Sequence, residues 1–286
     1  MSEDQDIPPA APDGSPRTIL VLGGGGMKGI AHIGVWKALE EAGVRPDAIM
    51  GTSIGALIAA GVAGGYGWRE LAEIARKLTK DDIVAINRRA VFFGGVREEA
   101  VFLGDHYHEF IERILPVKTF DEMKIPVRLN SVSLVTGEEV WFGTGAREDV
   151  PVADAVYASC ALPIYFPPLK LDGDFLVDGG VLDVFPVRKA AAWGAERIIG
   201  VDVGSEFLPP AEGFFDRGMI AIHDRVLNLN LRDQRSRCLD NYDGPSLLYV
   251  RPQVGHLGGW DFERTQYFLE EGYRAAREAL KKAEAA

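Results

Sequence analysis

Ser53 lies between two glycines in the pentapeptide Gly51-Thr-Ser-Ile-Gly55. This G-x-S-x-G pattern is typical of a nucleophile elbow, a tight strand-to-helix turn that presents a serine hydroxyl above a helix N-terminus. Gly51 and Gly55 suit such a turn because neighbouring backbone can approach it only where side chains lack bulk. A serine that caps a helix between two glycines gives the same pattern, so other stretches have to decide between the two interpretations.

A second stretch that could do chemistry is glycine-rich and spans Gly23 to Gly29. Its Gly24-x-Gly26-x-x-Gly29 spacing matches a dinucleotide fingerprint, but the next strand ends at Ser53 without the acidic residue that would bind a ribose. Bare amides at a helix N-terminus can instead hold an anion, and beside a serine nucleophile that anion is the oxyanion of a tetrahedral intermediate. The candidate oxyanion residues are Gly24, Gly25, Gly26, Met27, Lys28 and Gly29.

A serine nucleophile needs a base, and Asp178 is the best placed candidate. It ends the apolar segment Phe175-Leu-Val and is followed by Gly179 and Gly180, a pattern expected where a carboxylate must approach another backbone closely. We expect Asp178 and Ser53 to converge because both follow parallel strands. Standing alone, Asp178 would fit an Asp-Gly turn equally well.

The histidines give a weaker case for the base. The chain has five of them, at His32, His106, His108, His223 and His256. The order of residues in an α/β-hydrolase triad, which places the histidine after the acid, leaves His223 and His256 as candidates. His223 lies in a helical pattern, and His256 lies in a glycine-rich loop and is kept as the alternative base.

The elements around these residues alternate between strand and helix. A strand at Thr18–Leu22, the glycine-rich turn, a helix over 30–42 and a strand over 47–50 form a right-handed βαβ unit, which places both turns at one edge of a parallel sheet. The topology of residues 80–120 stays open apart from a helix near 106–115. Further strands are expected at 126–135, 139–142, 175–177, 198–202 and 247–250, with helices at 68–78, 152–159, 187–193, 214–239 and 261–284.

Composition and charge restrict the class of protein. A chain of 286 residues with 47% hydrophobic content can bury one large core, so we expect a disordered, proline-rich tail over 1–16 and a single domain over 17–286. The net charge of −11 argues against a nucleic-acid partner. There are two cysteines and no signal-peptide pattern, so we expect free thiols, a cytoplasmic location and only transient contact with membranes.

Together the three motifs resemble those of the patatin-like phospholipases, lipid acyl hydrolases that use a Ser-Asp dyad. The matching stretches are Gly24–Gly29 for the oxyanion loop, Gly51–Gly55 for the nucleophile elbow and Asp178-Gly-Gly180 for the acid, with Ala158–Pro163 and Phe166-Pro-Pro168 preceding the acid. The resemblance implies a three-layer α/β/α sandwich with a mainly parallel central sheet, and no histidine base. This sequence departs from the family in carrying Lys28 where arginine is usual and Asp183 where asparagine is common.

The sequence therefore predicts a serine acyl hydrolase that acts on phospholipids, lysophospholipids or related lipid esters through an acyl-enzyme, without metal or cofactor. Ser53 would be the nucleophile and Asp178 the general base. Met27, Ile54 and the loop at Phe166 would border the pocket, and an acyl chain could enter along aromatic residues at Phe92, Phe93, Phe207, Phe214 and Phe215. Two alternatives stay open: an esterase or thioesterase for soluble acyl groups, and a non-catalytic regulator that binds lipid or protein. Oligomeric state is not predicted.

Overall fold

The computed structural model describes residues 17–89, 98–240 and 242–285 of the chain. The expected tail over 1–16 and the aromatic pair Phe92 and Phe93 lie outside these residues. The strands are β1 (Thr18–Leu22), β2 (Ala48–Gly51), β3 (Val127–Ser133), β4 (Glu139–Gly143), β5 (Leu169–Leu171), β6 (Asp174–Asp178), β7 (Arg197–Val201) and β8 (Ser246–Val250). The α-helices are α1 (Ala31–Glu41), α2 (Ile54–Gly64), α3 (Trp68–Lys77), α4 (Lys80–Ile83), α5 (Gly104–Ile114), α6 (Val152–Cys160), α7 (Val187–Ala192), α8 (Met219–Leu239) and α9 (Thr265–Glu284). Short 3-10 helices occur at η2 (Gly26–Ile30), η5 (Phe120–Glu122), η6 (Gly179–Val181) and η7 (Phe214–Arg217).

The strands form one sheet in the order β5-β6-β3-β2-β1-β7-β8, with β4 also paired to β3. Five neighbouring strands of this order, β3-β2-β1-β7-β8, pair in parallel. By contrast, β4 and β6 run antiparallel to β3, and β5 runs antiparallel to β6. The sheet is therefore mainly parallel, as predicted, with an antiparallel part at one edge.

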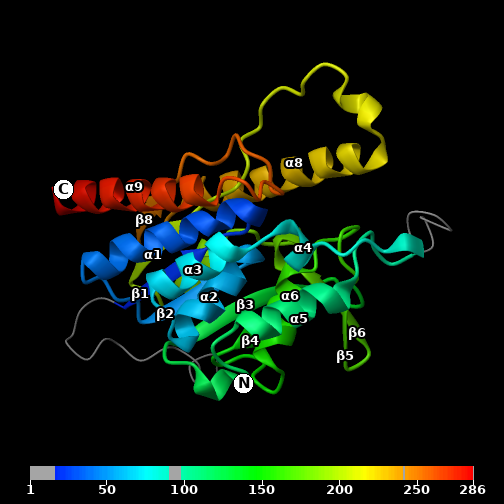
Figure 1. The fold of residues 1–286 in the computed structure, drawn as a ribbon. Coiled ribbons are helices and arrows are strands. Elements are labelled where there is room, and N and C mark those ends of the chain that lie inside the picture. The colour runs from blue at the N-terminus through cyan, green and yellow to red at the C-terminus, as the bar shows by residue number, and fades with distance from the viewer. Residues whose placement is uncertain (1–16, 90–97, 241, 286) are drawn as a thin grey trace.

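Both faces of the sheet are covered by helices. Alternate residues of β1 point to opposite faces: Leu20 and Leu22 belong to the larger core, and Ile19 and Val21 belong to the smaller one. The larger core includes residues of α1, α2, α5, α6 and α9, and Figure 1 shows α9 running alongside α1. The smaller core is formed with α7 and the C-terminal part of α8. These two cores confirm the predicted three-layer α/β/α arrangement.

Strand β6 approaches the site from an unexpected direction. Gly51 of β2 pairs with Leu129 of β3, and Asp178 of β6 pairs with Ser131, two residues further along. Leu129 and Ser131 both pair with β4 as well, so β2 and β6 must share the remaining edge of β3. Because β2 is parallel and β6 antiparallel to β3, their C-terminal ends meet head to head. The prediction that Asp178 follows a parallel strand is wrong, although the expected convergence is found.

Several element boundaries also differ from the sequence-based prediction. Residues 80–120 contain α4 and α5, and the strand β5 was not predicted. The helix expected over 214–239 is divided at Gly218, whose φ of 84° is a left-handed conformation that glycine adopts without strain. Helix α9 begins at Thr265 rather than at Asp261, and Glu263 and Arg264 form a turn just before it.

Candidate active site

Ser53 occupies the sharp turn between β2 and α2. Its φ of 56° and ψ of −128° are strained for a residue with a side chain, a strain that typically costs about 1 to 3 kcal/mol. The turn is tight because Gly51 and Gly55 come into close contact, and a Cβ atom at Gly51 would lie 2.5 Å from the Gly55 carbonyl oxygen. A Cβ atom at Gly55 would overlap the carbonyl oxygen of Leu22. The two glycines are therefore required by the geometry of the turn.

The Ser53 amide is held by a residue from a distant helix. Its N–H donates to the Oγ atom of Ser159 in α6 at 2.9 Å, and Ser159 is fully buried. This hydrogen bond fixes the strained turn against the helix that precedes β5. Ser159 lies in the segment Ala158–Pro163 that resembles the family pattern, but no pattern around a buried serine in a helix indicates this contact.

The Ser53 hydroxyl lies close enough to the Asp178 carboxyl to lower its pKa by hydrogen bonding. The Oδ1 atom of Asp178 also accepts from the Gly180 amide at 2.7 Å, and the Asp178 amide donates to the Ala161 carbonyl at 3.0 Å. Only 3% of Asp178 is exposed. Burial raises the pKa of this carboxyl from 3.8 to about 6, although the bonds from Ser53 and Gly180 lower it. A carboxylate with this pKa is ionised at neutral pH and is a better proton acceptor than an exposed one.

The residues after Asp178 connect it to the centre of the sheet. A Cβ atom at Gly179 would overlap the side chain of Asn130 in β3, so this position also requires glycine. Asn130 donates from Nδ2 to the Asp183 carbonyl at 3.0 Å, and the Asp183 Oδ1 atom accepts from the Phe185 amide at 3.1 Å. Burial raises the pKa of Asp183 to about 6. Asp183 thus closes the turn that follows the acid and replaces the asparagine expected there.

The glycine-rich loop lies against the elbow. A Cβ atom at Gly29 would overlap the Ile54 side chain, and a Cβ atom at Gly24 would lie 3.3 Å from that of Ser53. The Gly24 amide donates to the Val184 carbonyl at 3.0 Å, and the Met27 amide donates to the Gly259 carbonyl at 2.8 Å. Among the described residues, no group accepts a hydrogen bond from the amides of Gly25 or Gly26. Those two amides are the ones in the loop that remain available to an incoming anion.

Lys28 points beneath the loop into the protein. Its side chain is 1% exposed, and its Nζ donates to the Ser205 Oγ atom at 2.5 Å. Burial, together with Arg235 and Arg251, lowers the pKa of Lys28 to about 7. The carboxylate of Asp202 balances this cluster, because its Oδ1 atom lies 2.6 Å from Arg251 and 3.5 Å from Arg235. The cluster supports the glycine-rich loop from below.

Histidine takes no part in the geometry around Ser53 in the described residues. His32 is buried beneath the loop and bonds from Nε2 to the Gly23 carbonyl at 2.8 Å, and burial lowers its pKa to about 4. His106 and His108 bond to Asp81 and Asp154 on the surface. His256 lines the pocket but makes no hydrogen bond to Ser53 or Asp178.

A pocket of about 720 Å³ opens above Ser53 and Asp178. This volume suits a ligand of drug or lipid size. The predicted border residues Met27, Ile54 and Phe166 line it, as do Phe207 and Phe214, whereas Phe215 does not. An apolar wall of the pocket that was not predicted from the sequence is formed by Ile83, Tyr107, Leu162, Leu227, Leu231 and Trp260. The ring of Phe166 stacks on that of Tyr107 at 4.7 Å, which makes this side of the pocket suited to an apolar chain.

Within the described residues, no helix is long and apolar enough to cross a bilayer. The same part of the chain holds no group of three or more histidine, cysteine or acidic side chains that could bind a metal ion.

Comparison with known proteins places this site in context. The sequence profile of the patatin-like phospholipase family matches residues 20–191. An uncharacterized NTE family protein of Mycobacterium bovis is 32% identical over 69% of this chain and 52% of its own length. Lysophospholipase nte1 of Emericella nidulans is 30% identical over 92% of this chain and 18% of its own length. The chain thus spans about half or less of these curated relatives. Among solved structures, VipD of Legionella pneumophila shares the fold, with a TM-score of 0.57 over 94% of this chain and 67% of that chain, at 15% identity.

Proposed function

The chain belongs to the patatin-like phospholipase family, and we propose that it hydrolyses the acyl ester of a phospholipid or lysophospholipid with Ser53 as nucleophile and Asp178 as general base. The observation that carries the proposal is the meeting of β2 and β6 on one edge of β3, which brings the Ser53 hydroxyl to the Asp178 carboxylate. The apolar wall of the adjoining pocket supports an acyl chain as the ligand.

In the first step the Ser53 oxygen attacks the ester carbonyl carbon while its proton passes to Asp178. The carbonyl oxygen becomes an oxyanion that accepts hydrogen bonds from the free amides of Gly25 and Gly26. A well-placed donor of this kind is worth about 3 to 4 kcal/mol in the transition state. The tetrahedral intermediate then collapses, the alcohol leaves with the proton from Asp178, and the acyl group remains on Ser53.

In the second step water attacks the acyl-enzyme and gives its proton to Asp178. The second tetrahedral intermediate releases the fatty acid, and Ser53 regains its proton. Asp178 therefore acts first as base and then as acid in each step. Its pKa of about 6 is close to neutral pH, so the group can both accept and return a proton.

A fluorophosphonate probe and a substrate screen test this proposal. We expect rapid labelling of the wild-type protein, no labelling of Ser53→Ala, and normal labelling of Ser246→Ala, which removes an exposed serine in β8. The screen compares phosphatidylcholine, lysophosphatidylcholine, acyl-CoA and p-nitrophenyl esters. Turnover of the lipids is the expected result. Turnover of acyl-CoA or soluble esters alone would favour the esterase or thioesterase alternative, and absence of labelling would favour a non-catalytic regulator.

A further inference from the structure

Helix α8 has apolar residues on two opposite sides. Leu227 and Leu231 line the pocket on one side. Met219, Ile222, Val226 and Leu229 follow the helical spacing of i, i+3, i+7 and i+10 and are all exposed, Met219 at 76% and Val226 at 51%. A helix that is apolar on opposite sides is normally buried on both. In this fold only the side facing the pocket is covered within the described residues.

The exposed side of α8 continues into the mouth of the pocket. Phe215 in the short helix η7 is 63% exposed, directly before α8. Phe207 and Leu208, in the loop that leads to η7, are also exposed and line the pocket at the same time. Figure 1 shows η7 and the start of α8 together at one end of the molecule. Exposed apolar residues gathered in this way mark an interaction surface more often than a bare monomer surface.

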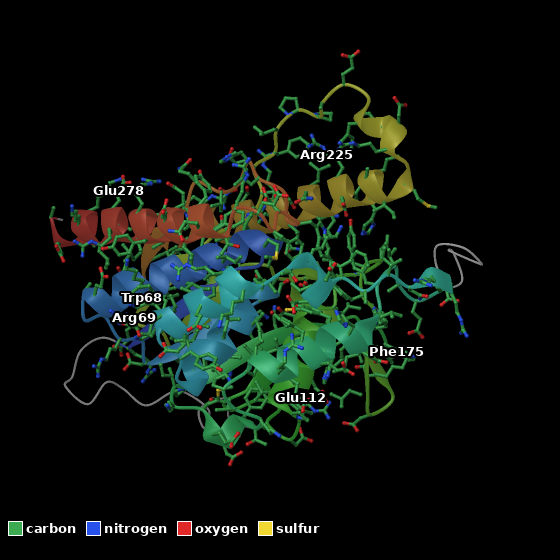
Figure 2. The ribbon with its side chains drawn as sticks, viewed as in Figure 1. Trp68, Arg69, Glu112, Phe175, Arg225 and Glu278 are labelled. Carbon is green, nitrogen blue, oxygen red and sulfur yellow. The ribbon has the colours of Figure 1, made fainter. Side chains whose placement is uncertain are left out.

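Arginines flank this apolar surface. The segment 206–232, which runs from the loop at Phe207 through η7 into α8, contains Arg217, Arg225 and Arg232 beside four acidic residues. The Arg225 guanidinium stacks on the Phe207 ring at 3.7 Å, and Figure 2 shows Arg225 between α8 and the preceding loop. Arginine beside exposed apolar side chains is typical of a segment that lies in the headgroup region of a lipid layer.

We propose that the N-terminal half of α8, with η7 and the loop at Phe207, docks on a lipid surface and delivers the acyl chain to the pocket behind it. The proposal rests on the proposed function, since a lipid substrate resides in such a layer. A second copy of the chain is the other occupant that an exposed heptad-like stripe could bind. The lipid surface is favoured because the apolar residues come from a helix, a 3-10 helix and a loop around the pocket mouth, which is broader than a single seam between helices.

The test measures vesicle binding and activity separately. Ile222→Glu/Val226→Glu changes the exposed side of α8, and neither residue lines the pocket. Leu134→Glu/Val135→Glu is the matched control, because these residues are 58% and 65% exposed in the turn after β3. Flotation with neutral phosphatidylcholine vesicles is carried out in the Ser53→Ala background, so that hydrolysis does not alter the vesicles. Hydrolysis of p-nitrophenyl butyrate in solution is measured with Ser53 intact.

We expect the α8 variant to bind vesicles at least tenfold more weakly than the control variant, because the apolar residues no longer enter the lipid layer. Both variants should hydrolyse p-nitrophenyl butyrate at the wild-type rate, which also reports that they are folded. Equal vesicle binding by the two variants overturns the proposal. The proposal is also overturned if the protein sediments as a dimer, the α8 substitutions dissociate that dimer, and vesicle binding stays the same. Complete inactivity of every protein with Ser53 intact would overturn the proposed function instead, whatever the flotation shows.

Discussion

Replacing Asp178 by asparagine should abolish turnover and at the same time stabilise the fold at neutral pH. The asparagine side chain would keep an oxygen for the Gly180 amide and offer an N–H group toward Ser53, so the local packing survives. The ionised carboxylate is lost, and with it the unfavourable desolvation that raises the pKa of Asp178 from 3.8 to about 6. At about 1.4 kcal/mol for each pH unit, this difference corresponds to about 2 to 3 kcal/mol of stability.

The gain in stability depends on pH in a defined direction. Below about pH 4 the carboxyl is protonated in both the folded and the unfolded chain, so wild type and variant should melt at similar temperatures. Between about pH 4 and 6 the folded wild type binds more protons than the unfolded chain, so its stability falls as the pH rises. Above about pH 6 the wild-type protein has lost the full ~2 to 3 kcal/mol of stability. The melting temperature of Asp178→Asn should then exceed that of wild type by about 5 °C.

Differential scanning fluorimetry from pH 4 to pH 8 measures this difference. Ser53→Ala is the control, because it is also inactive but keeps the carboxylate. Its melting temperature should fall with rising pH as that of wild type does, over a range that extends to somewhat higher pH because the bond from Ser53 no longer lowers the pKa of Asp178. If Asp178→Asn melts below wild type at every pH, or differs from wild type by the same amount at every pH, the assignment of a buried, ionised Asp178 is refuted. Near-normal turnover by this variant would refute its role as the base.

Three further predictions follow from the same geometry. The kcat/KM for p-nitrophenyl butyrate should rise about tenfold per pH unit below pH 6 and level off above it, because Asp178 must be ionised to accept a proton; a flat profile between pH 4.5 and 8 would sink this expectation. Ser159→Ala removes the acceptor of the Ser53 amide and should lower kcat about ten- to a hundredfold with little change in KM, whereas a loss seen only in KM would mean that Ser159 does not position the elbow. His256→Ala should keep most activity in a steady-state assay, and a folded but inactive protein would favour a Ser-Asp-His triad.

Local sequence signals predicted the elements that carry the site. The apolar run Thr18–Leu22 and the glycines around Ser53 each follow from packing within a few residues, so the βαβ unit and the elbow were visible in the sequence. The direction of β6 could not be predicted, because the residue pattern of a short strand is the same whether the strand is parallel or antiparallel to its neighbour. Its pairing with Ser131 depends on the path of the chain between them.

Contacts between distant residues account for the rest of what was missed. The amides of Gly24 and Met27 bond to Val184 and Gly259, more than a hundred residues away, and nothing near the loop indicates which donors stay free. The buried charge of Lys28 is likewise balanced by Asp202 across the sheet. Asp202, like Asp178, follows an apolar strand, so the same sequence signal marks a structural carboxylate in one place and the candidate base in the other.

The meeting of β2 and β6 explains how a carboxylate could serve without histidine. In a triad the imidazole spans the distance between serine and acid and carries the proton. Here Gly51 and Asp178 pair with residues of β3 only two positions apart, so in the proposed mechanism the acid contacts the serine directly and an intermediate group is not required. A carboxylate in water is a weak base for a hydroxyl, and the burial that follows from this position is what raises its pKa toward neutrality. The same strand geometry therefore provides both the contact and the basicity, and any change that lets water reach Asp178 should weaken catalysis even if the hydrogen bond to Ser53 is kept.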